Sequence, residues 1–174
     1  MKCFLVTGLI GSGKSEVSRI LGSQGFPVYD SDSRTKALYG RGELAYKIRK
    51  EVGLEISELG KVFSDEEKLR KLEAIVHPEV LEDFRKFALE SGSELVFFES
   101  AIALDKPLFR SAFDGVILVR ASQQKRFERN PKARSRSAFQ TETEDWDYLV
   151  ENEGSLEELE EKVNSIIETI KREI

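Results

Sequence analysis

The sequence has 174 residues, of which 40% are apolar and 34% are charged, enough for one compact globular core. Its net charge of −5 argues against nucleic acid or an anionic membrane as a partner. No stretch approaches the about 18 apolar residues that a membrane span needs. The only cysteine, Cys3, allows no intramolecular disulfide, which is typical of a reducing compartment. We therefore expect a cytoplasmic protein.

Five short apolar runs along the chain predict strands. Several are apolar at every position, the pattern of strands buried on both faces of a parallel sheet. The expected strands are Cys3–Val6, Val28–Tyr29, Leu95–Phe98, Val116–Val119 and Tyr148–Val150. Helical spacing of apolar residues predicts helices over Ser15–Leu21, Asp65–Ser91 and Leu156–Ile170. The alternation of strands and helices indicates an α/β fold with about five parallel strands.

Two stretches interrupt this alternation. Between the second and third strands the chain shows helical patterning and no clear strand, which predicts a helical insertion over about residues 33–92. Between the fourth and last strands, residues 120–136 are rich in Lys and Arg. They are either a solvated helix face or part of a lid over about residues 120–140 whose arginines neutralise a transferring phosphoryl group. Arg126 and Arg129 would share one helix face, and Asn130-Pro131 would end that helix.

The segment Gly8–Ser15 follows the first expected strand, precedes the first expected helix and reads G-x-x-x-x-G-K-[ST]. Glycines let the backbone turn tightly and bring N–H groups near phosphate oxygens, and the following helix offers its positive end. Lys14 would reach the β- and γ-phosphates, and the Ser15 hydroxyl would bind Mg²⁺. The motif predicts a site for a nucleoside triphosphate.

Asp30 and Asp32 follow the second expected strand. Ligands of doubly wound sheets bind beyond the carboxyl ends of the strands, so these carboxylates are candidates to orient or deprotonate a hydroxyl, or to hold Mg²⁺ through water. The alternative is that Asp32 or Ser33 caps a helix.

Two further polar features each have a structural and a functional interpretation. His77, the only histidine, is more often a cap or a packed residue than a catalyst, and Pro78 after it suits the first turn of a new helix. The segment Glu151–Ser155 follows the last strand and could border the nucleotide base, or it could be a turn in which Ser155 caps the last helix.

In these motifs the chain resembles the dephospho-CoA kinase family over nearly its whole length. The phosphate loop alone is shared by many kinases, whereas an Asp-x-Asp pair after the second strand and a Leu-Glu…His-Pro run are more specific. The matching segments are Thr7–Ser15, Val28–Asp32, Val62–Asp65, Leu72–Glu73, His77–Pro78, Gln140 and Asp147–Val150, with Asn152, Gly154 and Ser155. The family's Pro-Leu-Leu run after the third strand is replaced here by Ser100–Ala103.

The resemblance implies a P-loop, nucleoside-triphosphate-hydrolase-type fold of three layers and phosphorylation of the ribose 3′-hydroxyl of dephospho-CoA, with ATP and Mg²⁺. The implied ATP-binding residues are Gly8, Gly11, Ser12, Gly13, Lys14, Ser15, Glu16 and Asn152, with Ser15 on the metal. The implied catalytic residues are Asp32, Lys14, Arg126 and Arg129. Asp30, Asp32 and His77, with the insertion of about 33–92, would hold the acceptor. The protein would be a monomer or a weak homo-oligomer.

Two other classes of function remain open. One is a small-molecule P-loop kinase that acts on a nucleoside or nucleotide. The other is a module that binds a nucleotide without catalysis. A regulatory GTPase is disfavoured, because the sequence contains neither Asp-x-x-Gly nor Asn-Lys-x-Asp.

Overall fold

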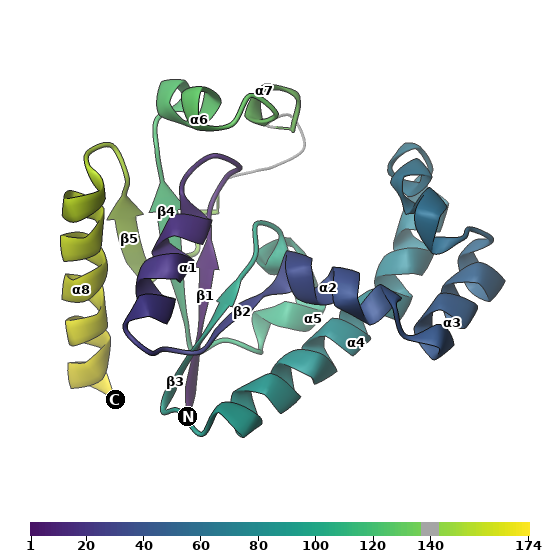
Figure 1. The fold of residues 1–174 in the computed structure, drawn as a ribbon, viewed down its shortest axis with the longest axis horizontal. Helices are drawn as coiled ribbons and strands as arrows, with labels where there is room; N and C mark the ends of the chain where they lie inside the picture. The colour runs from purple at the N-terminus through teal and green to yellow at the C-terminus, as the bar shows by residue number, and fades with distance from the viewer. Residues whose placement is uncertain (137–142) are drawn as a thin grey trace. The chain divides into compact units, whose positions relative to one another are not determined.

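The computed structural model describes residues 1–136 and 143–174 and contains one five-stranded sheet with the order β2-β3-β1-β4-β5 (Figure 1). β1 pairs in parallel with β3 and with β4, and β4 pairs in parallel with β5. The strands are β1 (Lys2–Thr7), β2 (Val28–Asp30), β3 (Leu95–Glu99), β4 (Gly115–Arg120) and β5 (Tyr148–Glu151). The predicted α/β fold with five parallel strands is confirmed.

The three predicted helices are confirmed as α1, α4 and α8. The helices are α1 (Lys14–Ser23), α2 (Ser31–Tyr39), α3 (Gly42–Val52), α4 (Glu66–Ser91), α5 (Pro107–Arg110), α6 (Gln123–Arg129), α7 (Ala133–Arg136) and α8 (Leu156–Glu173), with 3₁₀ turns η1 (Ile56–Ser64) and η2 (Ala103–Asp105). The expectation of a new helix at Pro78 was wrong, because α4 runs through it. Pro78 is exposed, so the carbonyl that loses its N–H partner there can bond to water.

The chain divides into two compact units. The first comprises Met1–Tyr29 and Ser91–Ile174, and the second comprises Asp30–Glu90. Among the described residues, none of the helices is long and apolar enough to cross a membrane.

In the first unit, successive residues of β1 and β3 point to opposite faces of the sheet, and both faces are buried. Phe4 and Phe97 belong to a core cluster that α1 and α8 complete on one face, where the two helices lie side by side (Figure 1). On the other face, Phe98 stacks on Tyr29 with a centroid distance of 5.1 Å and also contacts Phe109. Burial on both faces explains the continuous apolar runs, since each buried large side chain contributes about 1.5–3 kcal/mol.

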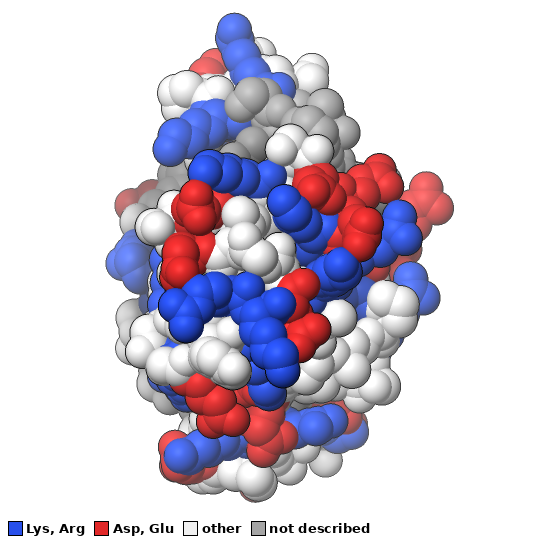
Figure 2. Space-filling view, turned by 90° about the vertical axis from the view of Figure 1, so that its right-hand side faces the viewer, with Lys and Arg blue, Asp and Glu red and all other residues white. Residues whose placement is uncertain are grey.

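The second unit is helical and has its own core. Its buried apolar side chains come from α2, α3, η1 and α4, and they include Leu38, Leu44, Ile48, Val62, Val76 and Phe84. Within this core the carboxylate of Asp83 is also buried, and it pairs with Arg34 at 2.8 Å and with Arg41 at 2.7 Å. On the face of the molecule in Figure 2, Lys and Arg side chains lie among Asp and Glu side chains, with no large area of one sign.

Candidate active site

The loop between β1 and α1 has a backbone that only glycine adopts easily. Gly8, Gly11 and Gly13 have φ angles of 149°, 81° and 102°. A Cβ atom at Gly11 would lie 2.5 Å from the backbone carbonyl oxygen of Arg126, and one at Gly13 would collide with the side-chain amide of Asn152. The loop is therefore pressed against α6 and against the segment that follows β5, and both contacts require glycine.

Lys14 and Ser15 open α1, directly after this loop. Gly13, the N-cap of α1, supplies no side-chain acceptor, so no capping side chain competes with an anion for the N–H groups of the first turn. The ammonium group of Lys14 donates to the Leu9 carbonyl at a long 3.4 Å. Such an arrangement of N–H groups and an ammonium group suits a polyphosphate.

Glu99 is a site residue that the sequence interpretation missed. It is the last residue of β3, lies opposite Val6 of β1, and accepts a 2.7 Å hydrogen bond from the Ser15 hydroxyl. An acidic residue that ends an otherwise apolar strand was a usable signal. Ser15 and Glu99 together present oxygen atoms of the kind that Mg²⁺ prefers.

Arg126 lies in α6 with only 7% of its surface exposed. Within the described ranges, its Nε and Nη1 atoms have no hydrogen-bond partner. Buried guanidinium N–H groups without acceptors are costly, because they have left water and gained no compensating hydrogen bond. The oxygen atoms of a phosphate would supply those acceptors.

Asn152 follows β5, is 6% exposed, and bonds to two other segments. Its amide nitrogen donates to the Ser12 carbonyl at 2.9 Å. Arg129 donates to the backbone carbonyl of Asn152 at 3.0 Å and to its side-chain oxygen at 3.2 Å. Ser155 accepts from the Glu158 N–H at 3.2 Å, so the expected cap of the last helix is confirmed.

A cavity of about 260 Å³ lies beside the phosphate loop, at the carboxyl ends of β4 and β5. Its lining residues are Leu9, Arg120, Ala121, Ser122, Arg126, Glu151 and Glu153. The Ser122 hydroxyl donates to Glu153 at 2.9 Å, and a hydrogen bond from the Ser122 backbone N–H holds the pKa of Glu153 below its ordinary value. Carboxyl ends of strands are where doubly wound sheets bind nucleotides.

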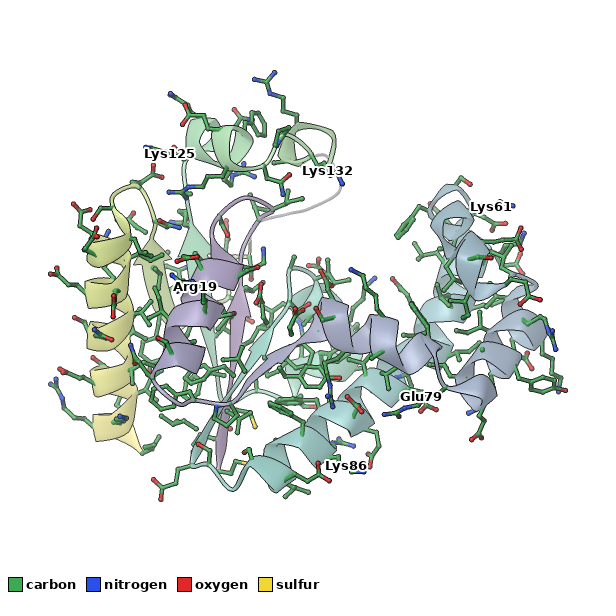
Figure 3. All side chains as sticks on the ribbon, in the orientation of Figure 1. Arg19, Lys61, Glu79, Lys86, Lys125 and Lys132 are labelled. Carbon is green, nitrogen blue, oxygen red and sulfur yellow. The ribbon has the colours of Figure 1, made fainter. Side chains whose placement is uncertain are left out.

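Glu16, the remaining candidate in the first helical turn, bonds to Arg19 on the surface of α1 (Figure 3). The hydrogen bond from the Arg19 side chain lowers the pKa of Glu16. Gln140 and the end of the expected lid lie outside the described residues. The helix expected to end at Asn130-Pro131 does so, with Asn130 as the C-cap of α6.

The candidate acceptor residues belong to the second unit. Asp30 is the N-cap of α2, and one of its oxygens accepts from the backbone N–H groups of Asp32 and Ser33 at 3.0 and 3.1 Å. The cap is thus Asp30 and not either of the residues named as alternatives. Within the part of the chain that the structure describes, the exposed Asp32 carboxylate accepts no hydrogen bond. His77 is half-buried in α4.

Comparisons with known proteins point to one family over most of the chain. The dephospho-CoA kinase family model matches residues 3–156. Dephospho-CoA kinase of Porphyromonas gingivalis is 40% identical over 146 residues, covering 78% of this chain and 71% of that protein. The enzyme of that name from Thermus thermophilus is 34% identical over 186 residues, covering 93% and 88%.

Solved structures show the same fold. TT1252 from Thermus thermophilus has a TM-score of 0.80 at 30% identity, covering 97% of each chain. Dephospho-CoA kinase from Campylobacter jejuni has a TM-score of 0.68 at 20% identity, covering 98% of this chain and 97% of that one. Shikimate kinase from Acinetobacter baumannii, with a TM-score of 0.54 at 19% identity, covers 98% of this chain and 95% of that one and shares the fold alone.

Proposed function

The chain belongs to the dephospho-CoA kinase family, and we propose that it phosphorylates the ribose 3′-hydroxyl of dephospho-CoA with ATP, giving CoA and ADP. The observation that carries this proposal is the family match, because it spans the phosphate loop, the Asp-x-Asp pair and the segment after β5 in one chain.

The triphosphate of ATP would lie on the loop of Gly8, Gly11, Ser12 and Gly13, with Lys14 on the β- and γ-phosphates. The buried Nε and Nη1 atoms of Arg126, which have no hydrogen-bond partner among the described residues, support a direct role on the transferring phosphoryl group. Arg129 is already bonded to Asn152, which favours a role in shaping the site. The cavity bounded by Ser122 and Glu153 would take the base and ribose.

Ser15 and Glu99 fit a magnesium ion, since both offer oxygen donors and they already lie 2.7 Å apart. When bound, Mg²⁺ neutralises charge on the phosphates during transfer. Glu16 would act only from the edge of this site, because its carboxylate is paired with Arg19.

In the transfer step, the 3′-oxygen of dephospho-CoA attacks the γ-phosphorus of ATP, the bond between that phosphorus and the β,γ-bridging oxygen breaks, and ADP leaves. The proton of the hydroxyl passes to the Asp32 carboxylate. The exposed Asp32 carboxylate, with no hydrogen bond to other described residues, supports this role. Asp30 would fix Asp32 by capping α2, and His77 would contribute to acceptor binding.

We further assign acceptor binding to the insertion of about 33–92 and lid closure to about 120–140, as lids of this kind exclude water from the reaction. The partners are then small molecules, with no nucleic acid or membrane involved. We expect a monomer or a weak homo-oligomer in the cytoplasm.

An acceptor panel tests the proposal. ADP formation is measured with ATP and, in turn, dephospho-CoA, a nucleoside, a nucleoside monophosphate and shikimate, and the products are identified by mass spectrometry. Turnover with dephospho-CoA alone supports the proposal. Turnover with a nucleoside or nucleotide and none with dephospho-CoA would replace it with the rival kinase, and nucleotide binding with no turnover would indicate a non-catalytic module.

A further inference from the structure

The side chain of Asn152 lies where three segments of the first unit meet. It bonds to the phosphate loop through the Ser12 carbonyl and to α6 through Arg129, and it is itself part of the segment after β5. Its own backbone N–H is bonded to the Arg120 carbonyl at 2.8 Å, which fixes it to the end of β4. A single amide side chain therefore touches the loop and the helix that carries the lid arginines.

The amide uses both of its ends, and each end has a different partner. The nitrogen can only donate and bonds to the loop, whereas the oxygen can only accept and bonds to Arg129. Gly13 makes this possible, because any side chain there would occupy the position of the Asn152 amide. Gly13 of the loop motif and the Asn152 side chain are thus packed closely against each other.

Arg126 lies on the same helix as Arg129, the partner of Asn152. It lies in α6 one turn before Arg129, and its backbone carbonyl oxygen packs against Gly11 of the loop. The hydrogen bond from Arg129 to Asn152 joins α6 to the segment after β5, and Asn152 in turn bonds to the loop. Without this bond, the loop and α6 would be joined less tightly.

We propose that Asn152 is a positioning residue that couples the phosphate loop to α6, so that the loop's shape and the placement of Arg126 depend on one side chain. This inference rests on the proposed function, because Arg126 is assigned there to the transferring phosphoryl group. The Asn152 side chain acts through Ser12 and Arg129 and needs no contact of its own with the substrate.

A double-mutant cycle tests the coupling. Asn152→Ala, Arg129→Ala and the double variant are compared with the wild type in kcat and in KM for ATP, and ADP affinity is measured by calorimetry. We expect each single variant to lose about 10-fold or more in kcat/KM for ATP, and the double variant to be no worse than the poorer single variant. The KM for ATP should rise in Asn152→Ala, whereas a smaller folded fraction would lower kcat and leave KM unchanged.

If Asn152→Ala does not fold, Asn152→Asp takes its place in the test. It keeps the acceptor for Arg129 and removes the donor to Ser12, so it should raise KM for ATP. In the Asn152→Asp background, Arg129→Ala should still lower kcat/KM for ATP. Asn164→Asp, the same chemical change on the exposed face of α8, should leave KM unchanged. If the losses in kcat/KM of the two single variants multiply in the double variant, the proposed coupling is overturned. A wild-type enzyme without dephospho-CoA turnover would instead overturn the proposed function, and the ADP affinities would still report on the contact.

Discussion

The Ser15 hydroxyl donates a 2.7 Å hydrogen bond to the Glu99 carboxylate, which joins the start of α1 to the end of β3. The bond exists because β3 lies directly beside β1, so that Glu99 ends its strand next to the phosphate loop. A neutral hydroxyl and a carboxylate at the carboxyl edge of a parallel sheet form a suitable site for a hard cation.

Glu99→Gln and Ser15→Ala should each raise the Mg²⁺ concentration needed for half-maximal turnover by about 10–100-fold, because each removes an oxygen donor or its charge. The measurement is a Mg²⁺ titration of ADP formation at saturating ATP. Glu94→Gln, at the opposite end of β3, is the control and should titrate as the wild type does. An unchanged Mg²⁺ requirement in Glu99→Gln would remove Glu99 from the metal site.

Gly13→Ala should abolish nucleotide binding, because the new Cβ would collide with the Asn152 amide at a φ of 102°. Gly25→Ala is the matched control, since Gly25 has a φ of 86° and open space around its Cβ position. It should cost about 1–2 kcal/mol of stability through backbone strain alone and leave ADP affinity unchanged. Calorimetric ADP titration and thermal unfolding of both variants separate collision from strain, and ADP binding by Gly13→Ala at wild-type affinity would be incompatible with this loop geometry.

Asp83→Asn should destabilise the protein by about 1–3 kcal/mol, because the buried carboxylate loses its charge while Arg34 and Arg41 keep theirs. The value is below that of a fully buried pair, since the two arginine side chains are 45% and 57% exposed. Glu79→Gln, on the same helix, removes a half-buried partner of the exposed Lys47 side chain and should change stability by less than about 1 kcal/mol (Figure 3). Urea unfolding of the two variants gives the comparison, and equal effects would show that burial of Asp83 adds nothing.

The hydrogen bond from Ser122 should make part of the stability dependent on pH. It lowers the pKa of Glu153 in the folded state, so the stabilisation is present above the unfolded-state pKa of about 4.3 and is lost as pH falls through the lower folded value. The difference in Tm between the wild type and Glu153→Gln should therefore be largest near neutral pH and shrink below about pH 4. A difference that is constant with pH would mean that the carboxylate's charge is not involved.

The sequence pattern predicted the strands and long helices well, because burial on both faces leaves runs that contain only apolar residues. Phe4 and Phe98 point to opposite faces, and each face is covered. The pattern could not predict Glu99 as a partner of Ser15, since that contact depends on which strand lies beside β1.

Arg126 and Arg129 show the same limit of sequence interpretation. Their spacing predicts one shared helix face. It does not show that Nε and Nη1 of the buried Arg126 lack a hydrogen-bond partner among the described residues, whereas Arg129 bonds to Asn152. That difference arises because the phosphate loop and the segment after β5, which are far apart in the chain, both pack against α6. The capping of α2 by Asp30, while the Asp32 carboxylate accepts no hydrogen bond from the described residues, is likewise a matter of local geometry.

CoA formation by Asp32→Asn is the most direct measurement of the central claim, that a carboxylate of the second unit deprotonates the acceptor hydroxyl. CoA and ADP are quantified for the wild type and the variant at saturating ATP and dephospho-CoA, with ADP affinity measured in parallel. We predict that the wild type releases one ADP for each CoA, and that the variant binds ADP normally but forms CoA about 10²–10⁴-fold more slowly. Near-normal CoA formation by Asp32→Asn would contradict the account.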